Sequence, residues 1–421
     1  MIKALLDRPV PASLLVAALL LLTTLGVVYS PRSIVLFLLF QGTILLLYFA
    51  RMPRGVKGAL TAITLGALLP VLGTINAYYM EITIQVGIFV ALALGLNIVV
   101  GLAGLLDLGY VAFFAVGAYS WAIFGSPQAN LIFGGNHFPL NPWWFFPFLL
   151  VGVAVAACAG ILLGLPVLRL HGDYLALVTL GFGEVIRVLA NNLDKPINFT
   201  NGPKGITPIG RPPIFFWSAL QAMGIDPDPN LIYPLYLYAL VLLIVGATVL
   251  ANRRLEDSHI GRAWEAIRED QTAAQAMGVP LVRMKLLAFA CGASFAGTVG
   301  VLFSAKQIFI NPESFTFMES IGVLAMIILG GMGSIPGAIL GAAVVTILNL
   351  QVLKGLSLWL NELRNAGTVI FGYSLANLPT QLEPAKYERM VFGLILVLMM
   401  IFRPQGILPA RRRHRELGEE P

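Results

Sequence analysis

Charged side chains are scarce in this sequence. Only 11% of its 421 residues are Asp, Glu, Lys or Arg, whereas 58% are hydrophobic. A typical soluble domain carries about 25% charged residues, so these few charges could not cover a soluble surface, and the same deficit excludes a disordered chain or a coiled coil. The composition instead predicts an integral membrane protein with apolar material for about 10–12 helices of roughly 20 residues.

Motifs of nucleotide binding and catalysis are also missing. The sequence contains no Gly-Lys dipeptide, so it has no Walker A loop for ATP, and it has neither a His-Glu-x-x-His motif nor a Ser/His/Asp set. Its two cysteines, Cys158 and Cys291, lie in apolar runs, and its four histidines show no ligand spacing. We therefore expect no enzyme, no metal site and no cofactor.

Long apolar runs occupy most of the chain. They cover residues 12–29, 32–50, 58–76, 82–101, 106–124, 144–165, 231–251, 284–304 and 388–403. Residues 173–190 are apolar but contain Glu184 and Arg187, and 319–353 is too long for one helix and is interrupted by glycines. If 173–190 counts as a span and 319–353 as two segments, the sequence predicts an all-α helical membrane bundle of about 12 segments, with some broken or re-entrant helices.

The positions of the positive charges predict an orientation. With alternating spans, most of the 27 Lys and Arg residues lie on the side that also holds both termini. Since Lys and Arg accumulate in cytoplasmic loops, we expect both termini in the cytoplasm. The net charge of +6 is then a signal of orientation rather than of nucleic-acid binding. Residues 191–230 become an external loop, and residues 252–283 become a charged internal loop.

The internal loop has the pattern of two short helices. Ile260, Ala263, Trp264 and Ile267 recur at helical spacing, with charged residues on the opposite face. Asp270 is expected to cap a second helix, which Gly278 ends. Such an element suits docking into a groove of a soluble partner; an amphipathic linker lying on the lipid surface is the alternative.

The same loop resembles a known family. Glu265-Ala266-Ile267, Asp270, Ala273-Ala274 and Met277-Gly278 are similar to the coupling loop of ABC importer permeases of the branched-chain amino-acid type, although Ile267 replaces the usual second alanine of that signature. Further stretches resemble the family's motifs in order, namely 95–104, 108–119, 171–184, 200–206, 330–341 and 402–408. The additional N-terminal spans resemble the LivM subtype.

The resemblance implies an organisation and a set of partners. Residues 1–79 would be extra N-terminal membrane spans, 80–410 the permease core and 411–421 a cytoplasmic tail. The core would hold 191–230 as a periplasmic loop and 252–283 as the coupling loop. The expected partners are a second homologous permease subunit in a heterodimer, two cytoplasmic ATPase subunits, a periplasmic amino-acid-binding protein and the lipid membrane, with no nucleic acid. The loop residues expected to couple to the ATPase are Gly261, Arg262, Trp264, Glu265, Ala266, Ile267, Asp270, Ala273, Ala274 and Gly278.

A few polar residues and glycines within the apolar runs are candidates for a translocation path. Glu184 and Arg187 lie three residues apart on one helical face, and they either line the path or form a structural ion pair. Asp107 either caps a helix or faces a cavity. Gly181 and Gly183 could open an unwound helix whose end binds a substrate carboxylate.

The late glycine-rich stretch predicts close helix packing or a hinge. Gly333, Gly337 and Gly341 form a GxxxGxxxG pattern that lets a neighbouring helix approach closely. Pro336 within it frees a backbone hydrogen bond and favours a kink.

Three functional hypotheses follow. The first is the transmembrane permease subunit of an ATP-driven importer of leucine, isoleucine and valine in the bacterial inner membrane, or of urea or short amides, which related permeases carry. The second is a secondary transporter or channel that works alone, which is disfavoured because Glu184 is the only acid well inside a span. The third, a membrane enzyme, is disfavoured by the missing catalytic site.

Overall fold

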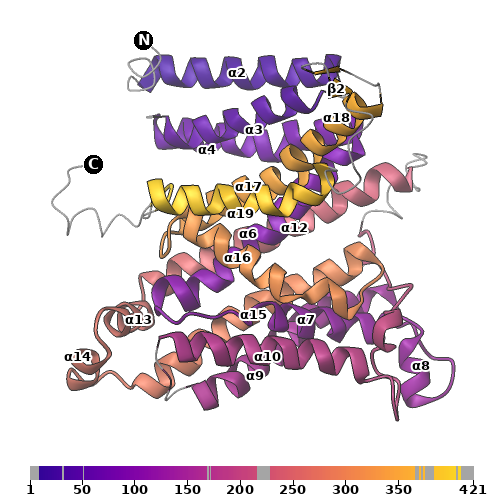
Figure 1. The fold of residues 1–421 in the computed structure, drawn as a ribbon, viewed down its shortest axis with the longest axis vertical. Coiled ribbons are helices and arrows are strands. Elements are labelled where there is room, and N and C mark those ends of the chain that lie inside the picture. Colours follow the sequence, from indigo (N-terminus) through magenta and orange to yellow (C-terminus); the bar gives the residue numbers. More distant parts are fainter. Residues whose placement is uncertain are drawn as a thin grey trace. The chain divides into compact units, whose positions relative to one another are not determined.

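In the computed structural model the chain is almost entirely helical (Figure 1). The structure describes residues 9–30, 33–50, 52–167, 170, 172–215, 228–365, 369–370, 373–374, 384–403 and 406–408. Among these residues, nine helices are long and apolar enough to cross a membrane, and three shorter apolar helices accompany them. The helical membrane bundle expected from the composition is therefore confirmed. The number of about 12 segments and the side of the termini stay predictions, and the predicted tail 411–421 lies outside the described residues.

The chain divides into two compact units. The first comprises Met1–Gln85, Phe216–Ala239 and Leu350–Ala385, and the second comprises Val86–Phe215, Leu240–Asn349 and Lys386–Pro421. Four elements contribute residues to both units: α6 (Ala77–Leu96), α12 (Pro229–Glu256), the π-helical turn η6 (Leu348–Leu353) and α19 (Pro384–Phe402).

The first unit is built on the N-terminal helices. These are α2 (Pro9–Tyr29), α3 (Ile34–Phe49), α4 (Arg54–Ile63), the π-helical turn η1 (Thr64–Leu68) and α5 (Leu69–Ile75). Later segments join them: the Tyr238 hydroxyl donates to the Leu65 carbonyl at 2.8 Å, and the Tyr78 hydroxyl to the Leu350 carbonyl at 3.1 Å. The later part of η6, from Leu350, also belongs here, with α18 (Lys354–Asn365) and the paired two-residue strands β1 (Val369–Ile370) and β2 (Tyr373–Ser374).

The second unit holds the remaining helices. They are the π-helical turn η2 (Asn97–Leu102), α7 (Val111–Phe124), α8 (Gln128–Phe133), η3 (Pro142–Trp144), α9 (Phe145–Val167), α10 (Asp173–Asn192), η4 (Gly202–Lys204), α13 (His259–Glu269), α14 (Gln271–Ala276), α15 (Leu281–Gln307), η5 (Pro312–Phe315), α16 (Phe317–Gly330) and α17 (Ile335–Ile347). Its core is the packing of α7, α9 and α15. Glycines allow this packing: a Cβ placed on Gly160 of α9 would lie 2.8 Å from the Phe289 carbonyl oxygen of α15.

Two predicted spans are interrupted by irregular backbone. The run 106–124 is helical only from Val111, because residues 103–110 form a non-helical segment between η2 and α7. The long run 319–353 is divided, as expected, into α16 and α17 by a turn at 331–334. Pro336 lies in the first turn of α17, where its missing N–H costs nothing. Pro336 therefore begins a helix at the predicted break, and its role in a hinge stays a prediction.

The glycine pattern packs α17 on α16. A Cβ on Gly337 would lie 2.8 Å from the Gly330 carbonyl oxygen, and one on Gly341 would lie 2.7 Å from the Gly330 Cα. Gly333 is outside both helices, in the turn, with a positive φ of 78°. The two helices form a tight antiparallel pair around the break.

Candidate functional site

The charged loop after α12 folds as the two expected short helices. Ser258 caps α13 by accepting the Ile260 and Gly261 N–H groups at 3.2 and 3.3 Å. Asp270 caps α14 in the same way, accepting the Thr272 and Ala273 N–H groups at 2.7 and 3.0 Å. Gly278 follows α14 with a positive φ of 87°, as expected for a helix stop.

The apolar face of these helices is buried within the chain itself. Trp264 and Ile267 of α13 are 0% and 1% exposed, and the Trp264 indole donates to the Met284 carbonyl of α15 at 2.8 Å. On α14, Ala274 is buried, and Gln271 accepts from the buried Lys285 at 2.9 Å. Figure 1 shows α13 and α14 beside one end of α15. A lipid surface therefore cannot receive this apolar face.

The opposite face of the loop is open. Among the predicted coupling residues, Gly261 is buried against the end of α12, Glu265 and Ala266 are half-buried, and Arg262, Asp270, Ala273 and Gly278 are exposed. The exposed surface continues over Thr272 and Gln275, and Met277 at its tip is 84% exposed. The loop thus presents a rigid, capped and mostly polar surface, which suits docking of another protein.

A second feature surrounds the irregular segment 103–110. Asp107 there is fully buried; its Oδ1 accepts the Gly109 N–H at 2.9 Å, and its Oδ2 has no hydrogen-bond partner among the described residues. The next N–H, of Leu108, donates to the Thr179 hydroxyl of α10 at 3.0 Å. Asp107 therefore caps the turn before α7, which is the first of its two expected roles. It does not line the neighbouring hollow, which was the second.

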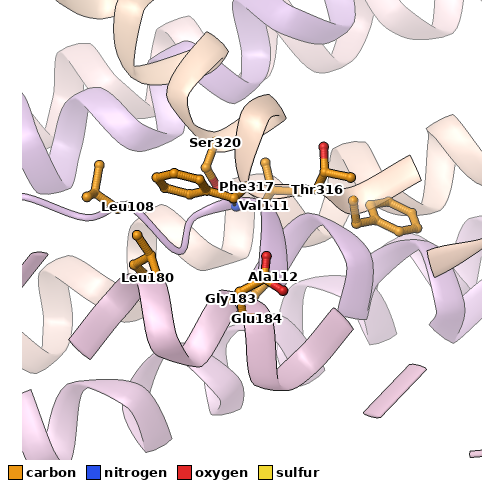
Figure 2. Close-up of a pocket in the computed structure, with 10 residues that line it drawn as sticks. Leu108, Val111, Ala112, Leu180, Gly183, Glu184, Thr316, Phe317 and Ser320 are labelled. Carbon is orange, nitrogen blue, oxygen red and sulfur yellow. Dashed lines mark hydrogen bonds between the residues drawn. The ribbon is translucent and has the colours of Figure 1, made fainter. Parts of the chain in front are cut away.

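The hollow lies between α10, α16 and the start of α7. It has a volume of about 210 Å³, counted with the solvent space at its mouth. Figure 2 shows Leu180, Gly183 and Glu184 of α10 facing Phe317 and Ser320 of α16. The remaining walls are Leu108, Val111, Ala112, Phe315 and Thr316. The Val111 N–H donates to the Ser320 hydroxyl at 3.1 Å, which ties α7 to α16 in the wall of the hollow.

Three charged side chains lie at one end of this hollow. Arg187 donates from Nε to Glu184 and from Nη1 to Glu313 of η5, each at 2.9 Å. The side chains are 25%, 38% and 63% exposed for Arg187, Glu184 and Glu313. The predicted pair therefore exists, but Arg187 also connects α10 to η5, and of the pair only Glu184 lines the hollow.

The two glycines of α10 do not unwind it. The helix is continuous from Asp173 to Asn192 through Gly181 and Gly183, so the expected unwound helix is not found there. Gly183 instead lets α10 approach the irregular segment, since a Cβ on it would lie 3.2 Å from the Gly109 Cα. Gly181 has open space around its Cα.

Several residues of these two features were not anticipated from the sequence. Glu313 lies outside the apolar runs, Ser320 lies in the run 319–353 whose prediction concerned only its glycines and Pro336, and Thr179 is one of many hydroxyl residues in apolar helices. Asn97, which lies outside both features and accepts the Gly333 N–H, could have been noticed in the sequence, because an amide within an apolar run must find partners in the membrane. Arg268 was indistinguishable from the other charges of its amphipathic helix.

Comparisons with known proteins identify the family. The profile of the family described as "Branched-chain amino acid transport system / permease component" matches residues 78–400. The chain is 40% identical over 351 residues to the high-affinity branched-chain amino acid transport system permease protein LivM of Salmonella typhimurium, covering 80% of this chain and 71% of the relative. It is 39% identical to LivM of Escherichia coli, over 78% of this chain and 70% of the relative.

A second kind of permease protein also matches in part. The LivH permease protein of Escherichia coli is 32% identical over 151 residues, covering 36% of this chain and 40% of the relative. No solved structure gives a significant match. The match over residues 78–400, together with the 40% identity to a LivM permease protein, shows that this chain belongs to the family of branched-chain amino acid transport permeases.

Proposed function

We propose that this chain is the transmembrane permease subunit of an ATP-driven importer that moves leucine, isoleucine and valine across the bacterial inner membrane. The observation that carries the proposal is the 40% identity over 80% of the chain to a permease protein of a branched-chain amino acid transport system. The partners are a second permease subunit of the LivH kind, two cytoplasmic ATPase subunits and a periplasmic amino-acid-binding protein.

The loop of α13 and α14 is the proposed contact with the ATPase. Its apolar side packs on α15, whereas its exposed side, from Arg262 through Gly278, is available for contact with a soluble protein. Capping at both helix starts keeps this surface rigid, which favours transmission of force over loose tethering. The family's separate ATPase subunits also fit a chain without a P-loop.

The hollow between α10 and α16 is the proposed part of the translocation path. Most of its lining residues are apolar, among them Leu108, Val111 and Leu180, which suit an aliphatic side chain, and the Glu184 carboxylate suits an ammonium group. Gly183 lies in this wall, Arg187 pairs with Glu184, and Asp107 caps the turn beside Leu108.

Reconstitution tests the proposal. Proteoliposomes that contain this chain, its LivH-like partner and the ATPase subunits should take up radiolabelled leucine only with ATP and the binding protein. Isoleucine and valine should compete, whereas urea and acetamide should not. If urea or acetamide competes and isoleucine and valine do not, the substrates of the transporter are urea or short amides. Uptake by this chain alone, driven by an ion gradient, would contradict the proposal and favour a secondary transporter.

A further inference from the structure

One arginine of helix α13 points into the helical bundle. Arg268, half-buried in the last turn of α13, donates from Nη1 to the carbonyl oxygen of Gly101 in η2. Gly101 lies at the C-terminal end of the continuous helix α6–η2, where carbonyl groups lack partners and a positive charge is favoured. The hydrogen bond therefore joins the charged loop to the point where a membrane helix is broken.

The second break meets the same point. A Cβ on Gly101 would lie 2.6 Å from the Gly333 nitrogen, and a Cβ on Gly333 would lie 2.9 Å from Arg268 Nη1. The Gly333 N–H donates to the Asn97 Oδ1 of η2 at 2.9 Å. The guanidinium, the end of η2 and the turn between α16 and α17 thus share one cluster, the Arg268 node, formed by Asn97, Gly101, Arg268 and Gly333.

Glycines make room for the arginine. Gly104, with a φ of 67°, faces the stem of Arg268, and a Cβ there would lie 2.8 Å from the Arg268 Cγ. Asn97 is 1% exposed, and its Nδ2 has no hydrogen-bond partner among the described residues. A buried amide with an unused donor is costly, so an arrangement of the node that satisfied this donor would be favoured.

Both elements held by the node lead to the hollow. From η2 the chain runs through 103–110 to Leu108 and Val111, which line the hollow. From the turn at 331–334, α16 runs back about 20 Å to Ser320 and Phe317 on the other wall. The Val111–Ser320 hydrogen bond joins the two elements again at that end.

We infer that Arg268 is the positioning residue through which movement of the α13–α14 loop shifts the two broken elements and so changes access to the hollow. The inference rests on the proposed function, because it requires ATPase subunits to dock on the α13–α14 loop and to move it. Arg268 touches no substrate; it acts through the backbone of Gly101 and Gly333.

The test uses the complete reconstituted importer. Arg268→Gln and Asn97→Leu should leave the exposed docking surface unchanged, so ATPase subunits should co-purify and hydrolyse ATP. Leucine uptake per ATP should fall about tenfold, the scale of one lost charged hydrogen bond. Arg268→Lys should restore part of it. The double variant should fall no further than either single variant, because both changes remove the same connection. Arg403→Gln, which removes an exposed arginine outside the loop, is the matched control and should behave as wild type.

A second readout separates coupling from simple loss of structure. Ala112 lines the hollow, and an Ala112→Cys variant in a background without Cys158 and Cys291 reports its accessibility to a maleimide. Trapping with ATP and vanadate should change the labelling rate in the wild-type protein, leave it unchanged with Arg268→Gln, and change it in part with Arg268→Lys. If Arg268→Gln shows normal uptake per ATP and a normal labelling change, the inference is wrong and the proposed function stands. Absence of ATP-driven uptake by the wild-type importer would overturn the proposed function instead.

Discussion

At the scale of single residues, the three charges beside the hollow have different surroundings. Glu184 lines the hollow and is 38% exposed, whereas Glu313 is 63% exposed and is absent from its walls. Both accept from Arg187 at 2.9 Å. Because part-exposed ion pairs contribute only about 0–1 kcal/mol, loss of either pair should hardly change stability. A loss of transport caused by a substitution of Glu184 would then result from a lost contact with the substrate and not from a lost ion pair.

Glu184→Gln should reduce leucine uptake by the reconstituted importer about tenfold, because an amide cannot pair with the substrate ammonium as a carboxylate does. The melting temperature should change by no more than a few degrees. Glu313→Gln is the control, since it removes the other ion pair of Arg187 without altering the hollow. If both variants transport leucine at the wild-type rate, Glu184 serves only as a structural partner of Arg187.

At the scale of elements, the short helix α14 depends on its cap. Asp270 accepts two backbone N–H groups, and removal of such a cap costs about 1 kcal/mol. In a helix of six residues this cost should loosen the exposed surface. Asp270→Ala should therefore reduce the fraction of ATPase subunits that co-purifies with the permease, and Asp270→Ser, which keeps an accepting oxygen, should restore it. Equal co-purification by the alanine and serine variants would show that α14 need not be ordered to bind.

The contact of α9 with α15 is the other element that can be tested directly. A Cβ on Gly297 of α15 would lie 2.5 Å from the Ala156 Cβ of α9, so Gly297→Leu should overpack this core. Overpacking typically costs about 1–3 kcal/mol, and a lower melting temperature in size-exclusion chromatography after heating should reveal it. Gly246→Leu in α12, where no atom lies within 4 Å of the added Cβ, should melt as wild type. Identical melting of both variants would contradict the close approach.

The elements also show what the sequence could reveal. Length and apolarity predict the long helices, and local signals predict the caps at Asp270 and the stop at Gly278, because each depends on neighbours within a few residues. The start of α7 at Val111 and the place of Arg268 depend on distant partners. Arg268 and Gly101 are 167 residues apart in the chain, and Asn97 and Gly333 are 236 apart. No local pattern carries that information, so the hollow and the node emerge only from the folded chain.

At the scale of the whole molecule, one unit contains every residue of the loop, the hollow and the Arg268 node. The N-terminal helices belong to the other unit together with Phe216–Ala239 and Leu350–Ala385. The family profile begins at residue 78, after α5. The expected division into extra spans 1–79 and a core 80–410 stays a prediction, which deletion of the N-terminal helices would examine.

The arrangement across the membrane follows from which helices cross it. Helix α12 has 28 residues and contains an 18-residue stretch of mean hydropathy 2.2, so Lys204 before it and Met277 after it should face opposite sides. Both α9 and α10 separate Asn136 from Lys204, and if α10 crosses despite its charges, these two residues should face the same side. All three positions are exposed and accept a cysteine without disturbing a core.

In a background without Cys158 and Cys291, a membrane-impermeant maleimide added to intact cells stripped of their outer membrane should label Asn136→Cys and Lys204→Cys. It should label Met277→Cys only after the membrane is broken, because the positive charges of that loop hold it in the cytoplasm. Labelling of all three in broken membranes is the control. If Asn136→Cys and Lys204→Cys face opposite sides, α10 does not cross, and Glu184 and Arg187 then enter the membrane from a re-entrant helix rather than a span.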